Sequence, residues 1–290
     1  MKSLLSLKIQ LSPVQPSILM TKGFLYTAFG AKYVDEARVS ARSLKQADPT
    51  AKTCLVTDQS MEPDAEFDFV MPITSASTTE IYAALDSGAY YRKIEQFARS
   101  PFDLTVYLDS DTFVPHSLVG LFELLDRYDM LVTPDCNAEV NYAFEQQKAP
   151  FNTIPPAFGA FNTGVFAFKK SPAALDFLRL WQSNHETHVR QHTTNDQPAF
   201  RLSLFQSQVR YHVLPVTYNW LSWVPYFIPS GGRVMVMHGR NPWLFKWARE
   251  FNAPTATIVG STSWKHQWMT WSARVLHWLS RRGIISRPDL

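Results

Sequence analysis

The segment from Leu104 to Val114 reads LTVYLDSDTFV, an apolar run that ends on two aspartates one residue apart. Its β-branched and aromatic residues are typical of a strand buried inside a sheet. Because side chains alternate along a strand, Asp109 and Asp111 would point to the same side of a regular strand. The chain must therefore fold so that a buried strand delivers two carboxylates to one place.

Two carboxylates this close repel each other unless a positive charge lies between them. A hard divalent cation, Mg²⁺ or Mn²⁺, carrying diphosphate oxygens would neutralise the pair. The alternative is a strand end followed by solvated acidic turn residues. The apolar strand that runs directly into Asp109 and Asp111 favours the metal site.

Strand and helix patterns alternate through the first ~130 residues. This alternation predicts an α/β fold with a Rossmann-like, mostly parallel central sheet and helices on both faces. The expected strands are 24–29, 52–57, 67–73, 104–108 and 130–133, and the expected helices are 32–46, 89–98 and 117–128. Ligands bind such sheets at the carboxyl ends of the strands, where Thr27, Asp58 and Asp109 all fall.

Residues 134–160 form a long, polar, proline-containing segment that we expect to be functional or mobile. Further strands are expected at 161–168, 211–214 and 233–237, and further helices at 172–190 and 196–205. No linker is evident, so we expect one domain over 1–263, followed by a basic, Trp-rich helix or tail over 264–290.

Composition narrows the class of protein. The 46% apolar content fits a globular chain. The net charge is +3, but residues 264–290 carry +4 and the remaining residues sum to −1, so a general nucleic-acid binder is not expected. Two cysteines give no disulfide framework, and Cys54 lies in an expected buried strand, which suits a reducing compartment. The N-terminal apolar stretch is interrupted too often for a signal peptide or a membrane span, so a cytoplasmic location is expected.

Three enzyme classes place Asp-x-Asp after a strand. A haloacid-dehalogenase-type phosphatase expects Thr or Val two residues beyond the second Asp, where this chain has Phe113, and puts the motif on its first strand. A nucleotidyltransferase usually opens with a glycine-rich, basic loop, whereas YTAFGAKY has a single glycine. The third class, a glycosyltransferase, has neither conflict.

Several motifs occur in the order found in glycogenin-like, family-8 retaining glycosyltransferases of the GT-A fold, and the chain resembles this family over about residues 22–247. The motifs are Tyr26-Thr27-Ala28, YLDSDT, Phe161-Asn162-Thr163-Gly164, Asn195-Asp196-Gln197 and His238-Gly239. The resemblance implies a GT-A fold with a smaller antiparallel portion on the acceptor side.

The resemblance also implies a nucleotide-sugar donor. Residues Tyr26, Thr27 and Ala28, with Asp58, would hold the uridine of a UDP-sugar. Lys93 resembles the basic residue that reaches toward the donor phosphate or sugar, and Arg92 competes for this role. A solvated helix face is the alternative for these two cations.

Asp109 and Asp111 would then bind the metal, and His238 resembles the third protein ligand. A lone histidine at a strand end is more often structural, but the apolar segment 234–237 delivers His238 as 104–108 delivers Asp109. Two carboxylates and an imidazole suit Mn²⁺ better than Mg²⁺. The metal would assist departure of the diphosphate.

The chain departs from the family after this histidine. The expected spacing of a glycine and a lysine before Pro-Trp is compressed to HGRNPW, which keeps Gly239 but lacks the phosphate-binding lysine. Arg240 would replace it, because a guanidinium binds phosphate in bidentate geometry.

Asn162, Asp196 and Gln197 match positions that contact the sugar in the family, and Asp196 is expected nearest the anomeric carbon. Its alternative role is helix capping, because Asn195-Asp196 begins an expected helix. Retention of configuration is implied by the resemblance.

The tail carries an aromatic stripe at 4-3-4-3 spacing, flanked by arginines: Trp264, Trp268, Trp271, Val275 and Trp278. Either this face packs on the domain, or the helix lies on an anionic membrane.

These observations together predict a metal-dependent transfer of a hexose from a UDP-sugar to a glycan, protein or lipid acceptor. The alternative is a nucleotide- or glycan-binding module of the same fold that is catalytically impaired, which the altered HGRNPW segment favours.

Overall fold

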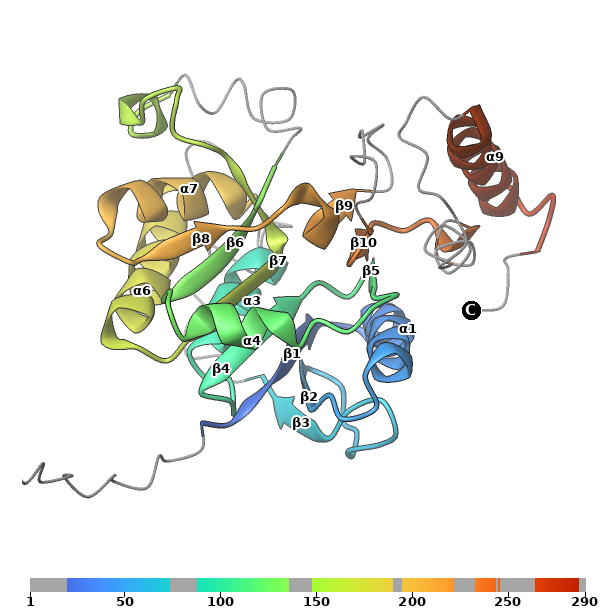
Figure 1. The fold of residues 1–290 in the computed structure, drawn as a ribbon, viewed down its shortest axis with the longest axis horizontal. Coiled ribbons are helices and arrows are strands. Elements are labelled where there is room, and N and C mark those ends of the chain that lie inside the picture. The colour runs from blue at the N-terminus through green and yellow to red at the C-terminus, as the bar shows by residue number, and fades with distance from the viewer. Residues whose placement is uncertain are drawn as a thin grey trace, which may run out of the picture.

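A seven-stranded sheet forms the centre of the molecule (Figure 1). The computed structural model describes residues 20–73, 88–135, 148–189, 195–221, 233–243, 245 and 264–286. The strands lie in the order β3-β2-β1-β4-β7-β6-β8. Their bounds are β1 Lys22–Ala28, β2 Thr53–Thr57, β3 Phe69–Pro72, β4 Leu104–Leu108, β6 Met130–Pro134, β7 Phe161–Lys169 and β8 Tyr211–Val213.

Most neighbouring strands of this sheet are parallel. β1 pairs in parallel with β2 and β4, β2 with β3, and β6 with β8. β7 runs antiparallel between β4 and β6. The expected mostly parallel sheet is confirmed, with one reversed strand beside the Asp-x-Asp strand.

Helices cover both faces of the sheet, because its strands alternate apolar side chains between two cores. Phe24 and Tyr26 of β1 pack with α1 (Ala31–Ala47) and α4 (Gly120–Leu125). Leu25 and Tyr107 pack on the opposite face with α3 (Gly88–Phe97), α6 (Pro172–Val189) and α7 (Gln197–Gln206). Strands buried on both faces explain the nearly continuous apolar runs of the sequence.

A second, three-stranded sheet lies beside the first, in the order β5-β10-β9. Its strands are two residues each: β5 Thr112–Phe113, β9 Trp220–Leu221 and β10 Met237–His238. β10 is antiparallel to β5, and Thr112 lies opposite His238. This pairing brings the start of HGRNPW, His238, next to the Asp-x-Asp turn. The β5–β10 pair is the small antiparallel portion that the resemblance implied.

Two short 3₁₀ helices, η2 (Phe151–Thr153) and η3 (Val216–Asn219), complete the described connections. Cys54 is fully buried in β2, so the expectation of a cysteine in a buried strand is confirmed, and burial raises the pKa of its thiol to about 12. Cys136, the N-terminal stretch before Met20 and much of segment 134–160 lie outside the described residues.

The C-terminal helix α9 (Trp264–Arg281) lies on the far side of the small sheet from the central sheet (Figure 1). Ala273 is buried with Phe113 and Trp220, whereas Trp271 and Trp278 are 63% and 49% exposed. Position 273 is half a helical turn away from the aromatic stripe, so the helix packs through its opposite face. The expectation that the aromatic face packs on the domain is therefore wrong for Trp271 and Trp278. No described helix is both long and apolar enough to cross a membrane.

Candidate active site

The Asp-x-Asp segment forms a turn at the end of β4. The strand ends at Leu108; the backbone N–H of Asp109 still donates to the carbonyl of Gly164 at 2.8 Å, and that of Thr112 donates to the carbonyl of Asp109 at 3.3 Å. Residues 109–111 therefore do not continue β4 as a regular strand. The two carboxylates instead converge because the chain turns from β4 into β5.

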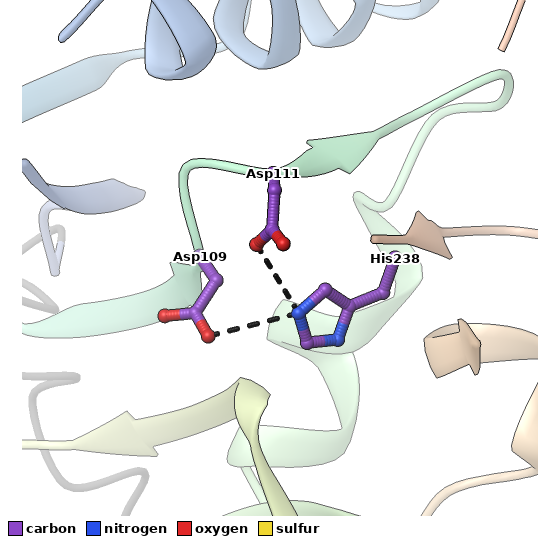
Figure 2. A group of neighbouring side chains, drawn as sticks. All are labelled: Asp109, Asp111 and His238. Carbon is purple, nitrogen blue, oxygen red and sulfur yellow. Dashed lines mark ion pairs between the residues drawn. The ribbon is translucent and has the colours of Figure 1, made fainter. Parts of the chain in front are cut away.

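Asp109, Asp111 and His238 come together at this turn (Figure 2). The Nε2 atom of His238 lies 3.3 Å from Asp111 Oδ1 and 3.7 Å from Asp109 Oδ2. One potential ligand atom from each residue lies within 4.8 Å of the others. Two carboxylate oxygens and an imidazole nitrogen form a donor set that suits a divalent cation such as Mn²⁺.

The charges of this group favour a cation at the site. Burial opposes ionisation of Asp111, yet His238 and Arg240 lower the pKa of Asp111 to about 2. Burial also opposes protonation of His238, yet Asp111 and Asp109 raise the pKa of His238 above its usual value. The two carboxylates therefore favour a positive charge on or beside His238.

Lys93 of α3 points into the same site. Its Nζ lies 2.9 Å from Asp109 Oδ1 and 3.5 Å from Asp196 Oδ2. Burial favours the neutral amine, but the charges of Asp109 and Asp196 raise the pKa of Lys93 well above its usual value. Lys93 is buried whereas Arg92 is exposed. The alternative that Lys93 lies on a solvated helix face is therefore wrong.

Asp196 immediately precedes α7 but does not cap it. Its side chain makes no capping hydrogen bond, and both carboxylate oxygens accept from Thr163 Oγ1 at 3.0 Å. Asn195 Oδ1 instead accepts the backbone N–H of Gln197 at 2.9 Å. The capping role therefore does not explain this carboxylate, which is 1% exposed and faces Lys93.

A register shift between β6 and β7 shapes the Phe161–Gly164 motif. Val132 pairs with Phe166 but Thr133 pairs with Asn162, so intervening residues of β7 bulge out. Thr133 Oγ1 donates within the bulge, to the carbonyls of Val165 at 2.8 Å and Asn162 at 3.2 Å. Such bulges re-aim side chains next to functional sites.

The proposed uridine-binding residues lie at the end of β1. Thr27 Oγ1 is 3.0 Å from the hydroxyl of Tyr107, which donates to Asp109 Oδ1 at 2.6 Å. Tyr26 is fully buried, and its ring packs edge-on against Phe67, so its side chain does not face a ligand. Ala28 is the last residue of β1 and is also buried.

Asp58 follows β2 and supports the neighbouring turn. Its Oδ1 accepts the backbone N–H of Gly30 and the amide of Gln59, both at 2.8 Å. Burial works against ionisation, but these hydrogen bonds lower the pKa of Asp58 below its usual value. The carboxylate is ionised and largely exposed at the carboxyl edge of the sheet.

Arg240 lies over the site, held by two carboxylates. Its Nε donates to both oxygens of Glu36 on α1, at 3.0 and 3.1 Å, and its Nη1 lies 3.2 Å from Asp111 Oδ2. The preceding Gly239 has φ 116°, a conformation that side chains rarely allow, and its N–H donates to the Asp111 carbonyl at 2.8 Å. This turn places a half-exposed guanidinium where a diphosphate would approach the metal.

Gln197 lines a cavity of about 20 Å³ with Phe151, Ile154 and Arg201. Among the described residues, its buried Oε1 has no hydrogen-bond partner. Arg201 donates to the carbonyls of Phe158 and Gly159 and so ties this part of segment 134–160 to α7.

Some residues that organise the site were not predicted. Tyr107, Thr163 and Asn219 hold Asp109, Asp196 and His238 in place, and Glu36 holds Arg240. Thr163 lies within a recognised motif, and Tyr107 lies two residues before Asp109 on the same strand. Nothing in the spacing of Glu36 or Asn219 identifies them.

Comparisons with known proteins agree with this geometry. Residues 99–238 match the model of a family described as nucleotide-diphospho-sugar transferases. No curated protein matches the chain in sequence.

Similar solved structures are glycosyltransferases. An active-site mutant of LgtC has a TM-score of 0.58 and 15% identity, covering 87% of this chain and 95% of that one. The galactosyltransferase LgtC with donor and acceptor sugar analogues has a TM-score of 0.54 and 16% identity over the same shares. Mouse xyloside xylosyltransferase 1 has a TM-score of 0.53 and 16% identity, covering 76% of this chain and 97% of that one.

The chain thus has the GT-A fold, and the family match on this fold supports a glycosyltransferase that uses a nucleotide-diphospho-sugar donor. The expected fold and enzyme class are confirmed. The glycogenin-like specificity stays a prediction.

Proposed function

We propose that the protein transfers a hexose from a UDP-sugar to an acceptor hydroxyl, with metal assistance and retention of configuration. The observation that carries this proposal is the convergence of Asp109, Asp111 and His238 beside the buried Lys93–Asp196 pair. All of these side chains meet near the carboxyl ends of β1 and β4, where ligands bind sheets of this kind.

The donor set fits Mn²⁺. Lys93 and Arg240 each pair with one oxygen of Asp109 and Asp111, and the other oxygen of each carboxylate faces His238 Nε2, where a cation would bind. Asp109, Asp111 and His238 would hold the ion, which when bound supplies Lewis-acid assistance to the leaving diphosphate. Arg240, the half-exposed cation beside Asp111, would take up charge on the same phosphates in place of the missing lysine.

In the transfer, the bond from the anomeric carbon to the UDP oxygen breaks and a bond to the acceptor oxygen forms, while the proton of the acceptor hydroxyl passes to the departing diphosphate. Asp196 would stabilise positive charge that develops at the anomeric carbon. Thr163 and Lys93 hold its carboxylate in one orientation, and Asn162 and Gln197 would contact the sugar hydroxyls.

Calorimetry of UDP binding with and without Mn²⁺ tests the donor site. We expect tight binding only with Mn²⁺, and we expect Asp111→Ala and His238→Ala to remove that dependence. Asp176→Ala, an exposed carboxylate on α6, is the matched control. Metal-independent UDP binding, or a fully active His238→Ala, would contradict the proposed site.

Donor hydrolysis over a panel of UDP-sugars separates the enzyme from the impaired binding module. Turnover of one UDP-hexose, lost in Asp196→Asn while Mn²⁺–UDP binding persists, is the expected result. UDP binding with neither hydrolysis of any donor nor transfer to any acceptor would favour the binding module instead.

We also propose that α9 contacts an anionic membrane while the protein remains cytoplasmic. The helix exposes Trp271, Trp278 and, just beyond its end, Ile284, together with Arg274 and Arg281. Exposed tryptophans flanked by arginines are typical of helices that lie at the lipid headgroups.

A further inference from the structure

His238 has two ring nitrogens, and a metal ligand needs the lone pair of one of them. Which nitrogen carries the proton is set by the hydrogen bond that the other makes. In the structure Nε2 faces Asp109 and Asp111, whereas Nδ1 lies 2.8 Å from Asn219 Oδ1. Nδ1 carries the proton if the atom of Asn219 that faces it is the amide oxygen.

The backbone N–H of Gly164 determines the orientation of both neighbouring amides. The N–H of Gly164 can only donate, and it lies 2.9 Å from the side chain of Asn162, so the atom facing it is Oδ1. This same Oδ1 is 2.8 Å from Asn219, so the Asn219 group that faces it is the NH₂. The remaining atom of the Asn219 amide is then the oxygen, and the Nδ1 of His238 must donate to it.

The amide orientations along this path are fixed by burial as well as by pairing. Asn162 and Asn219 are 5% and 2% exposed. The NH₂ of Asn219 also donates to Thr133 Oγ1, at 3.0 Å. Rotating either amide by half a turn would set donor against donor or acceptor against acceptor inside the protein, which is unfavourable.

We infer that Asn219 is a positioning residue. The Gly164 N–H orients the Asn162 amide, and Asn162 in turn orients the Asn219 amide. The Asn219 oxygen then accepts the Nδ1 proton of His238, which leaves the Nε2 lone pair free for the metal. This inference rests on the metal site of the proposed function and deepens it. The path also links a metal ligand to Asn162, a proposed sugar contact, so both are aligned by one buried set of hydrogen bonds.

Nitrogen-15 spectra of histidine-labelled protein test the tautomer directly. In the metal-free protein at alkaline pH, where the imidazole is neutral, the His238 signal should report Nδ1–H; His238→Gln assigns it. Asn219→Leu removes the acceptor, so we expect a shift toward Nε2–H. We also expect a 10- to 100-fold loss of Mn²⁺ affinity, as is common when a partner of a metal-bound histidine is removed.

Two further variants make the comparison specific. Asn219→Asp keeps an oxygen facing Nδ1 and should keep the Nδ1–H tautomer. Asn184→Leu, which removes a comparable amide between α6 and α7, should change neither the tautomer nor the Mn²⁺ affinity. If Asn219→Leu does not fold, Asn219→Ala removes the same acceptor without added bulk.

An Nε2–H signal in the unsubstituted protein would overturn the inference, as would an Asn219→Leu variant with an unchanged tautomer and full Mn²⁺ affinity. The proposed function fails separately: an Nδ1–H signal that depends on Asn219, in a protein that does not bind Mn²⁺, would refute the metal site and leave the hydrogen-bond path intact.

Discussion

Gly164 illustrates how single residues define this site. It lies on β7 where the imidazole of His238 and the carboxylate of Asp109 meet. A Cβ at this position would overlap the His238 ring and lie 2.9 Å from Asp109 Oδ2. The absence of a side chain at Gly164 is therefore a condition for the three potential metal ligands to converge.

We expect Gly164→Ala to displace His238 and to lower Mn²⁺ affinity by at least about tenfold, because the ring has no other room on that side. Mn²⁺ titration followed by electron paramagnetic resonance measures this. Gly159→Ala is the control, since its Cβ would meet Phe161 only at an ordinary 3.5 Å. Equal Mn²⁺ affinity in the two variants would show that the close approach is unimportant.

At the level of elements, one carboxylate joins β3 to its neighbours. Asp68, just before β3, accepts from Lys45 of α1 at 2.9 Å and from Lys52 at 2.8 Å, and also from Thr53 at the start of β2. These hydrogen bonds outweigh the effect of burial and hold the pKa of Asp68 well below its usual value. Ionised Asp68 thus stabilises the edge of the central sheet.

Because the pKa of Asp68 is lower in the folded than in the unfolded protein, its stabilisation is complete above the unfolded pKa of about 4 and is lost as the pH falls below it. We expect Asp68→Asn to lower the free energy of unfolding by roughly 1–3 kcal/mol at neutral pH. Urea unfolding should show this difference shrinking toward pH ~3. Asp35→Asn, an exposed carboxyl on α1, should have little effect at either pH.

The elements themselves were predictable to differing degrees. The long apolar runs predicted the bounds of β1, β4 and β7 to within two residues, and the helical periodicity predicted those of α1 to within one. The strand expected at 233–237 is only Met237–His238, and β5 and β9 were missed. A two-residue strand has no periodicity, so only its pairing partners define it.

Considered as a whole, the molecule places α9 beyond the small sheet (Figure 1). Two tryptophans of the stripe, Trp271 and Trp278, are exposed on this helix. Trp243 Nε1 donates to Ser280 Oγ at 3.1 Å, on the same side of the helix as the buried Ala273. Ala273 and Ser280 thus face the domain, whereas Trp271 and Trp278 are exposed.

If α9 docks on a membrane, the full chain should float with vesicles of phosphatidylcholine and phosphatidylglycerol but not with phosphatidylcholine alone. Replacing Trp271 and Trp278 by serine should reduce binding on the order of tenfold, because both side chains insert at the interface. Phe205→Ser, an exposed aromatic residue on α7, is the control. Equal flotation of the full chain and of a 1–263 truncation would contradict this role.

The sequence by itself determined the α/β class and most strands and helices, because these depend on local periodicity. It also determined Asp109, Asp111 and His238 as candidate metal ligands, because these lie in recognisable motifs. Only the tertiary structure decided that Lys93 rather than Arg92 faces the site, that Asp196 is not a cap, and that Asn219 directs His238. Such contacts join residues that are distant along the chain, and their geometry depends on how strands pair and bulge, which no local pattern encodes.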